Sequence, residues 1–283
     1  MIMDTFFYLQ SHPFFFWILF ILVSLSLGSF LGLLTYRLPL MLYQHWKEQC
    51  ETIPHEISST NLSTPFNLCF PRSQCPQCHV TLTGWQLIPL LGFFLQKGKC
   101  SACHHKISPR YPLIESITVI LSIVVFLKYG FSLPSFMYLL FTWILLSITV
   151  IDIEHQIIPD ELNYILMWLG LLWSLSSFHV SPRDSIIGAI TGYLFLWLIG
   201  SLYTRCRKKE GLGHGDYKLF AALGAWLGWQ PLPFLLLLSA LVGLLAGGTV
   251  LLLKKQSLKT PLAFGPYLAL GGWIMMMFPG ILS

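Results

Sequence analysis

Two acidic residues lie at the ends of long apolar stretches. Asp152 directly follows Thr149-Val150-Ile151, and Asp216 precedes the apolar run that begins at Leu219. A carboxylate at the edge of a hydrocarbon layer is costly, so each is a functional candidate. Two neighbouring carboxylates can share a proton and activate a water, as in aspartic proteases. A proton- or cation-coupled transporter is the alternative, although a pair at one membrane face rather than at the midplane favours the protease.

Four cysteines form a second candidate site, in the pairs Cys75-Pro-Gln-Cys78 and Cys100-Ser-Ala-Cys103. Two CxxC pairs at this spacing are typical of a closed, structural four-cysteine zinc site. Disulfides are the first alternative, but a reducing cytoplasm disfavours them. A redox pair is the second, but it would not need another copy. We expect the three flanking histidines to be solvated: His79, His104 and His105.

The composition defines the class of protein. Of 283 residues, 55% are hydrophobic and only 10% are charged, and the mean hydropathy is +0.68. Since a soluble domain carries about a quarter charged residues, the chain is predicted to be an all-α polytopic membrane protein in contact with lipid. The net charge of +5 lies in short loops between apolar spans, so it does not indicate a nucleic-acid partner.

The apolar stretches predict eight transmembrane helices, because a span needs roughly 20 residues. The stretch 219–253 is divided into two helices by Trp229-Gln-Pro-Leu-Pro233. The N-terminal run lacks a basic n-region and a cleavage site, so it is expected to be the first span. The predicted spans lie within residues 5–36, 112–128, 129–151, 162–182, 185–204, 219–253 and 260–283.

The basic residues predict the orientation. Segments 35–111, 204–218 and 254–260 hold 15 of the 17 Lys and Arg residues, which places them on the cytoplasmic side. Both termini are then expected on the outer face. Asp152 and Asp216 fall on the same, cytoplasmic face. The predicted parts are a first helix (1–36), a cytoplasmic zinc-binding domain (37–111) and a seven-helix membrane core (112–283).

The surroundings of the two aspartates differ. Pro159 ends the helix that carries Asp152, and Asp160 or a neighbour is expected to cap the next helix. Asp216 follows a loop containing Gly211, Gly213 and Gly215, whose backbone is free to adopt unusual dihedral angles and to approach another segment closely. From this residue alone, a helix cap is as good an explanation for Asp216 as catalysis. We expect Lys218 to reach the interface by snorkelling.

Several further motifs occur in a recognisable order along the chain. They are Gly28-Ser29-Phe30-Leu31, Tyr36-Arg37-Leu38-Pro39, the double CxxC followed by residues 107–115, Ile151-Asp152 through Pro159-Asp160, Gly213-His214-Gly215-Asp216-Tyr217-Lys218-Leu219, and Phe264-Gly265-Pro266-Tyr267-Leu268-Ala269. In these motifs the chain resembles the type IV prepilin peptidases, which are bacterial GxGD-type intramembrane aspartic proteases. The resemblance covers most of the chain.

The resemblance implies that Asp152 and Asp216 are the catalytic pair, with Gly213, Gly215 and Lys218 supporting the loop or substrate. It implies prepilin and type II secretion pseudopilin substrates, cleaved after a leader Gly at the cytoplasmic face of the bacterial inner membrane. The complete double-CxxC loop implies a second activity, N-methylation of the new N-terminus with S-adenosylmethionine. The loop shows no Rossmann-type glycine pattern for that cofactor.

Three further features have both a functional and a structural interpretation, or no firm assignment, from the sequence. Glu115 either contributes to the methyltransferase site or pairs with Arg110 or a backbone group. Residues 264–267 line the substrate path or pack a helix end. Acidic residues after Asp152 are assigned to hold the positively charged leader of the substrate: Glu154, Asp160 or Glu161. The polar stretch 44–68 has no assigned role.

Overall fold

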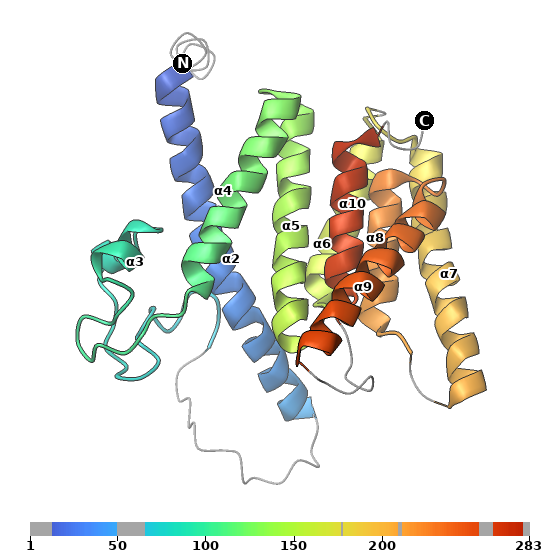
Figure 1. Ribbon diagram of the computed structural model, residues 1–283. Helices are drawn as coiled ribbons and strands as arrows, with labels where there is room; N and C mark the ends of the chain where they lie inside the picture. The colour runs from blue at the N-terminus through green and yellow to red at the C-terminus, as the bar shows by residue number, and fades with distance from the viewer. Residues whose placement is uncertain (1–12, 50–65, 177, 209–210, 255–262, 280–283) are drawn as a thin grey trace. The chain divides into compact units, whose positions relative to one another are not determined.

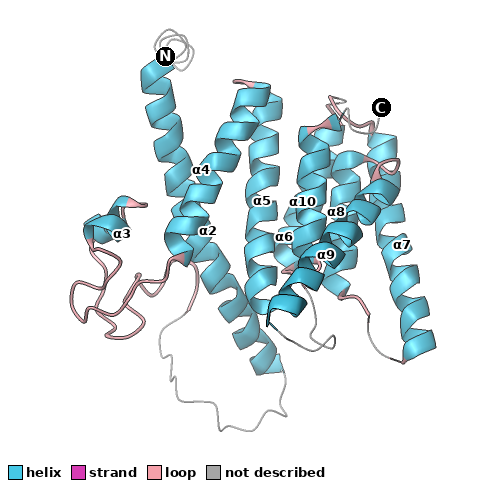
Figure 2. Ribbon diagram, viewed as in Figure 1, coloured by secondary structure: helices cyan, strands magenta, loops and turns pink. Residues whose placement is uncertain are grey.

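The computed structural model describes residues 13–49, 66–176, 178–208, 211–254 and 263–279, and every long element there is a helix (Figures 1 and 2). Extended pairing in this part of the chain is limited to two isolated bridges, Gln74 with Thr81 and Lys99 with Lys106. The long helices are α2 (Pro13–Gln49), α4 (Arg110–Tyr129), α5 (Leu133–His155), α6 (Asp160–Ser174), α7 (Pro182–Arg207), α8 (His214–Leu227), α9 (Leu232–Lys254) and α10 (Gly265–Met277).

The helices match the predicted apolar stretches, but their lengths differ. Within the described ranges, four are long and apolar enough to cross a membrane: α2 from Phe14 onward, α4, α5 and α7. By contrast α6, α8 and α10 have 15, 14 and 13 residues, which at 1.5 Å per residue gives about 20–23 Å, less than the roughly 30 Å of a bilayer core. The all-helical, multi-pass class is confirmed, while eight complete spans stay a prediction.

The chain forms two compact units, residues 1–128 and 129–283. The predicted boundaries at residues 37 and 112 stay predictions, since the structural division falls later and α2 continues beyond residue 36 to Gln49. In the first unit, α2 and α4 pack closely at Gly28. A Cβ added there would lie 2.8 Å from the Glu115 Cα atom. There Arg110 donates to the Thr35 hydroxyl at 2.8 Å.

In the second unit, α8 is contacted by α6, α7 and α10. Its residues from Leu219 to Leu227 are all buried, as expected for a helix that is apolar on every side. Gly188 of α7 and Gly224 of α8 let the two backbones touch, because a Cβ on Gly224 would lie 2.2 Å from the Gly188 carbonyl oxygen. Such close contact between small residues is how membrane helices pack without a hydrophobic driving force.

Some predictions fall outside the described residues. These are most of the polar stretch 44–68, namely residues 50–65, the basic segment from residue 255 to 260 and both ends of the chain. The orientation derived from the basic segments therefore stays a prediction.

Candidate aspartate site and four-cysteine cluster

Asp152 lies near the end of α5, and its side chain is only 5% exposed. The helix ends at His155, and Gln156 then adopts the left-handed conformation with φ of 56°, so the chain reverses before Pro159. The Asp152 Oδ2 atom accepts a hydrogen bond of 3.0 Å from the Gly265 N–H at the start of α10. The partial positive charge of a helix N-terminus favours a carboxylate at this place.

Gly265 allows this contact because it has no side chain. A Cβ there would lie 2.6 Å from Asp152 Oδ2 and 2.9 Å from the Ile158 Cδ1 atom. The sequence predicted either path lining or close packing for residues 264–267, and it missed the hydrogen bond to Asp152. The available signal was a glycine placed directly before Pro266 at a helix start.

Asp216 occupies the third position of α8 and is 8% exposed. Its Oδ2 atom accepts from the Gly213 N–H at 3.2 Å, so the carboxylate does cap the helix. Its Oδ1 atom is buried and has no hydrogen-bond partner among the residues that the structure describes. Buried polar atoms almost always have hydrogen-bond partners. The helix cap therefore accounts for the Oδ2 atom but not for the Oδ1 atom.

The glycines before Asp216 act through close approach rather than unusual dihedral angles. Gly213 has an ordinary φ of −72°, and the positive-φ glycines of the described chain lie elsewhere, at Gly98, Gly130 and Gly228. The expectation of unusual dihedrals was therefore wrong. A Cβ on Gly215, however, would lie 2.8 Å from the Ile158 Cβ atom, which confirms the close approach.

Ile158 connects the two aspartates. It contacts Gly215, directly before Asp216, and Gly265, which donates to Asp152. The structure thus gathers two buried carboxylates from α5 and α8 into one site, with α10 supplying a backbone donor.

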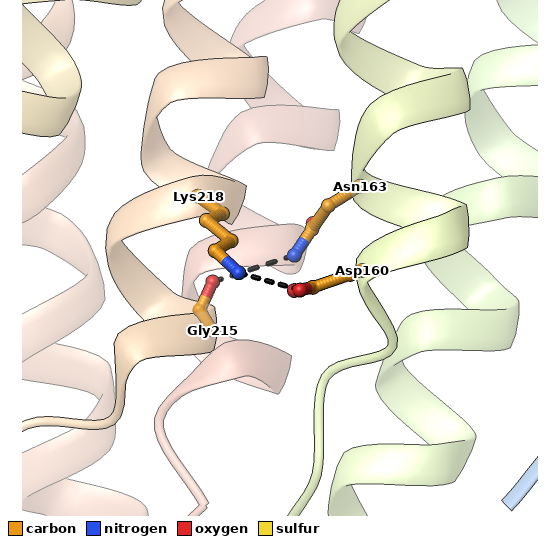
Figure 3. Close-up of polar contacts among 4 residues, drawn as sticks. All are labelled: Asp160, Asn163, Gly215 and Lys218. Atoms are coloured by element: carbon orange, nitrogen blue, oxygen red, sulfur yellow. Dashed lines mark hydrogen bonds and ion pairs between the residues drawn. The ribbon is translucent and has the colours of Figure 1, made fainter. Parts of the chain in front are cut away.

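A polar connection joins α6 to α8 beside this site (Figure 3). The Lys218 Nζ atom lies 2.6 Å from Asp160 Oδ2 and 5.8 Å from the centre of the Tyr164 ring. Asn163 Nδ2 donates weakly to the Gly215 carbonyl at 3.5 Å. Asp160 was expected as a possible cap for α6, but Pro159 holds the N-cap position and Asp160 pairs with Lys218 instead.

The four cysteines of the first unit form a compact cluster, with all sulfur atoms within 4.8 Å of one another. The Cys75 and Cys103 sulfurs are 3.8 Å apart, and those of Cys78 and Cys100 are 3.9 Å apart. Tetrahedral zinc with Zn–S bonds of about 2.3 Å requires sulfurs about 3.8 Å apart. All four thiols are free, which excludes the disulfide alternative.

Each CxxC pair is built by the same turn. His79 N–H donates to the Cys75 carbonyl at 3.0 Å, and His104 N–H donates to the Cys100 carbonyl at 3.0 Å. His79 and His104 have φ of 57° and 56°, a left-handed conformation in which histidine is enriched. They are exposed and lie outside the cluster, as expected, but their role in the turn was missed. Backbone hydrogen bonds from Cys78 and Gln77 lower the pKa of the Cys75 thiol to about 6, whereas burial and the neighbouring sulfurs raise the pKa of the Cys103 thiol.

Glu115 of α4 is buried, and its Oε2 atom accepts from the Leu90 N–H at 2.7 Å. Of the predicted pairings, the backbone group is therefore observed. Leu90 has φ of 57° and ψ of −53°, and Leu91 N–H donates to the Pro89 carbonyl at 2.6 Å. This is the strained form of the γ-turn, which persists only where its surroundings hold it.

The fold and these sites define a multi-pass membrane protein with a buried pair of carboxylates and a separate four-cysteine module. Residues 139–248 match the model of the Type IV leader peptidase family, and residues 22–129 match the Bacterial Peptidase A24 N-terminal domain. The two matches fall on the two structural units.

Three similar proteins carry the name prepilin leader peptidase/N-methyltransferase. The protein of Stutzerimonas stutzeri is 41% identical, and that of Pseudomonas aeruginosa 42%, each over 96% of this chain and 93% of the relative. The protein of Aeromonas hydrophila is 42% identical over 94% of this chain and 92% of its own length. The chain belongs to the type IV leader peptidase family. No solved structure matches it.

Proposed function

We propose that this chain is a bifunctional enzyme that removes the leader peptide of prepilins and pseudopilins and then methylates the new N-terminus. Family membership, over nearly the full length, supports both activities. We assign the cleavage to Asp152 and Asp216. The observation that supports this assignment is a pair of buried carboxylates whose neighbouring glycines, Gly215 and Gly265, both contact Ile158, and in which Asp216 Oδ1 has no hydrogen-bond partner among the described residues.

The proposed cleavage follows from the shared site. Two neighbouring buried carboxyl groups hold one proton between them more readily than none. The ionised carboxylate removes a proton from a water, which attacks the scissile carbonyl. The protonated partner donates a hydrogen bond to the carbonyl oxygen, and the C–N bond then breaks as the proton taken from the water passes to the leaving amine. The Gly265 N–H keeps Asp152 Oδ2 in place, and Asp216 Oδ1, which no group of the described ranges contacts by a hydrogen bond, is suited to hold the water.

The substrate presents an apolar helix to the bilayer and a basic leader to the cytoplasmic face. Its peptide bond must leave the helical hydrogen-bond pattern before it can react, so local unwinding is required. Asp160 already pairs with Lys218. Glu154 and Glu161, the other acids proposed to hold the leader, are exposed.

We assign a structural zinc ion to Cys75, Cys78, Cys100 and Cys103. The free thiols, their sulfur separations and the repeated turn fit a closed tetrahedral site. A zinc ion there would stabilise a loop that is too small for a large apolar core. S-adenosylmethionine is the proposed methyl donor, and it would supply the methyl group to the newly formed N-terminal amine.

We place the enzyme in the bacterial inner membrane, with eight spans, both termini in the periplasm and the aspartate site at the cytoplasmic face. The distribution of basic residues supports this orientation. The helices α6, α8, α9 and α10 complete the proposed eight.

One experiment tests both activities. Purified protein is incubated with a prepilin and S-adenosylmethionine, and the product mass is measured. Loss of the leader reports cleavage, and addition of one methyl group reports methylation. Substrate flux into vesicles with unprocessed prepilin would instead support the transporter alternative.

A further inference from the structure

An apolar surface projects from the four-cysteine module. It belongs to the segment 84–95, here called the apolar hairpin, which consists of the 3₁₀ helix η2 (Gly84–Leu87) and the short helix α3 (Leu91–Leu95). Trp85 is 77% exposed, Leu95 71% and Phe94 67%. Leu87 and Leu91 extend the same exposed set. So many large apolar side chains within one short segment indicate a contact surface.

The hairpin is held in a defined conformation by its polar side. A Cβ on Gly92 would lie 2.4 Å from the Gln86 carbonyl oxygen, so η2 and α3 pack backbone against backbone. Gln86 accepts from the Thr83 N–H at 2.9 Å and donates to the Ser101 hydroxyl at 2.7 Å. The polar groups thus face the four-cysteine module, and the apolar side chains are left on the outside.

A hydrogen bond attaches the hairpin to α4, which is a candidate membrane helix. Leu90, between η2 and α3, donates to the carboxylate of Glu115 in α4. Glu115 is five residues after Arg110, where α4 begins, so it lies about 7.5 Å along the helix at 1.5 Å per residue. Because α4 is a candidate membrane span, this contact places the hairpin beside its first turns (Figure 1).

Two positively charged residues directly follow the apolar hairpin in the sequence. Lys97 and Lys99 are both exposed, two and four residues after Leu95. Trp and Phe next to Lys are typical of segments that lie in the membrane interface, where rings enter the acyl boundary and ammonium groups meet anionic headgroups.

We propose that the apolar hairpin is an interfacial membrane anchor that attaches the four-cysteine module to an anionic lipid surface. Trp85, Leu91 and Phe94 enter the boundary of the acyl layer, while Lys97 and Lys99 contact lipid phosphates. The strained turn at Leu90, held by Glu115, sets the angle at which the hairpin meets the bilayer. This anchor does not depend on the catalytic assignment of the aspartates.

Photo-crosslinking tests the proposal with the full-length protein in nanodiscs of phosphatidylethanolamine and phosphatidylglycerol. Phe94 is replaced by p-benzoylphenylalanine, and the matched control carries it in place of Val80, which is exposed on the first cysteine turn. We expect irradiation to add the mass of one phospholipid at position 94 and none at position 80. Zinc content equal to that of the native chain verifies folding of both variants.

Other products would overturn the anchor. A crosslink from position 94 to prepilin or to a second copy of the chain would assign the surface to a protein. Equal lipid adducts at positions 80 and 94 would show that the hairpin has no special contact. A second measurement uses brominated acyl chains: fluorescence quenching should fall in Trp85→Phe, and unchanged quenching would contradict insertion.

Discussion

The four-cysteine cluster and the aspartate site both bring reactive groups together, but over different lengths of chain. In the cluster, two short turns each position a CxxC pair, and the two turns have the same hydrogen bonds. The aspartate site takes a carboxylate from α5, a carboxylate from α8 and a backbone donor from α10. The first geometry is largely local, and the second depends on helix packing.

This difference predicts that substitutions affect the two sites to different extents. A metal bound by four thiolates contributes its own binding energy to folding. The separation of the two aspartates is set by side-chain packing, such as the contacts of Ile158 with Gly215 and Gly265. Small changes in packing should therefore affect cleavage more than metal binding.

The largest expected effect comes from removing either carboxylate. Asp152→Asn and Asp216→Asn should each lower prepilin cleavage by about a thousandfold or more, because a group that acts as half of a pair leaves the other half inactive. Mass spectrometry of the product measures this, and zinc content should not change. Asp184→Asn, in the first turn of α7, is the matched control and should cleave normally. Near-normal processing by either site variant would contradict the dyad.

The next effect tests packing directly. Gly265→Ala would place a methyl group 2.6 Å from Asp152 Oδ2, so the carboxylate or α10 must move. A displacement of about 1 Å lowers catalysis by about a hundredfold, and we expect a loss of about that size in kcat. Gly32→Ala, whose added Cβ would meet only Tyr111 at 3.6 Å, is the control. Full activity of Gly265→Ala would show that the site does not need this contact.

A smaller effect on cleavage is expected when the cluster is broken. Cys75→Ser should release zinc and loosen residues 66–109, because one of four ligands is lost. Cleavage should fall only a few-fold, roughly 1 kcal/mol, and methylation should fall further. Metal analysis and the two product masses measure these changes. Cys69→Ser, an exposed free thiol outside the cluster, should retain zinc; a Cys75→Ser protein with full zinc content would contradict the assignment.

The sequence predicted the parts of each site but not all of the contacts. The CxxC spacing was sufficient for the cluster, since a short loop with four soft ligands has few other arrangements. The break between α8 and α9 and the close approach at Gly215 were also predicted and are confirmed. The membership in the prepilin peptidase family, inferred from motifs, is confirmed by the comparisons.

Contacts between distant segments could not be predicted. Gly265 is 113 residues from Asp152, and nothing local indicates that its N–H is a donor to that carboxylate. Asp160 was expected as a possible cap, which is the usual role of an acid at a helix start. The position of Lys218, 58 residues later, gives it a partner on another helix instead. The long apolar stretches likewise predicted where helices lie but not that α6, α8 and α10 are short.

The smallest expected effect concerns the pair between Asp160 and Lys218, which joins α6 to α8 near the aspartates. The side chains are 47% and 27% exposed, so water screens the attraction. A double-mutant cycle of Asp160→Asn and Lys218→Met should give a coupling of about 0.2–1 kcal/mol, as for other exposed pairs. Thermal unfolding in detergent measures it.

The same variants show whether the pair between Asp160 and Lys218 only supports the aspartate site or whether Lys218 takes part in the reaction. Because Lys218 is two residues after Asp216, loss of the pair should lower cleavage a few-fold without abolishing it, and restoring the pair as Asp160→Lys with Lys218→Asp should recover part of the loss. Lys106→Met, an exposed lysine of the four-cysteine module, is the control. A loss as large as that of Asp216→Asn, without rescue by the exchanged pair, would instead place Lys218 in contact with the reacting groups.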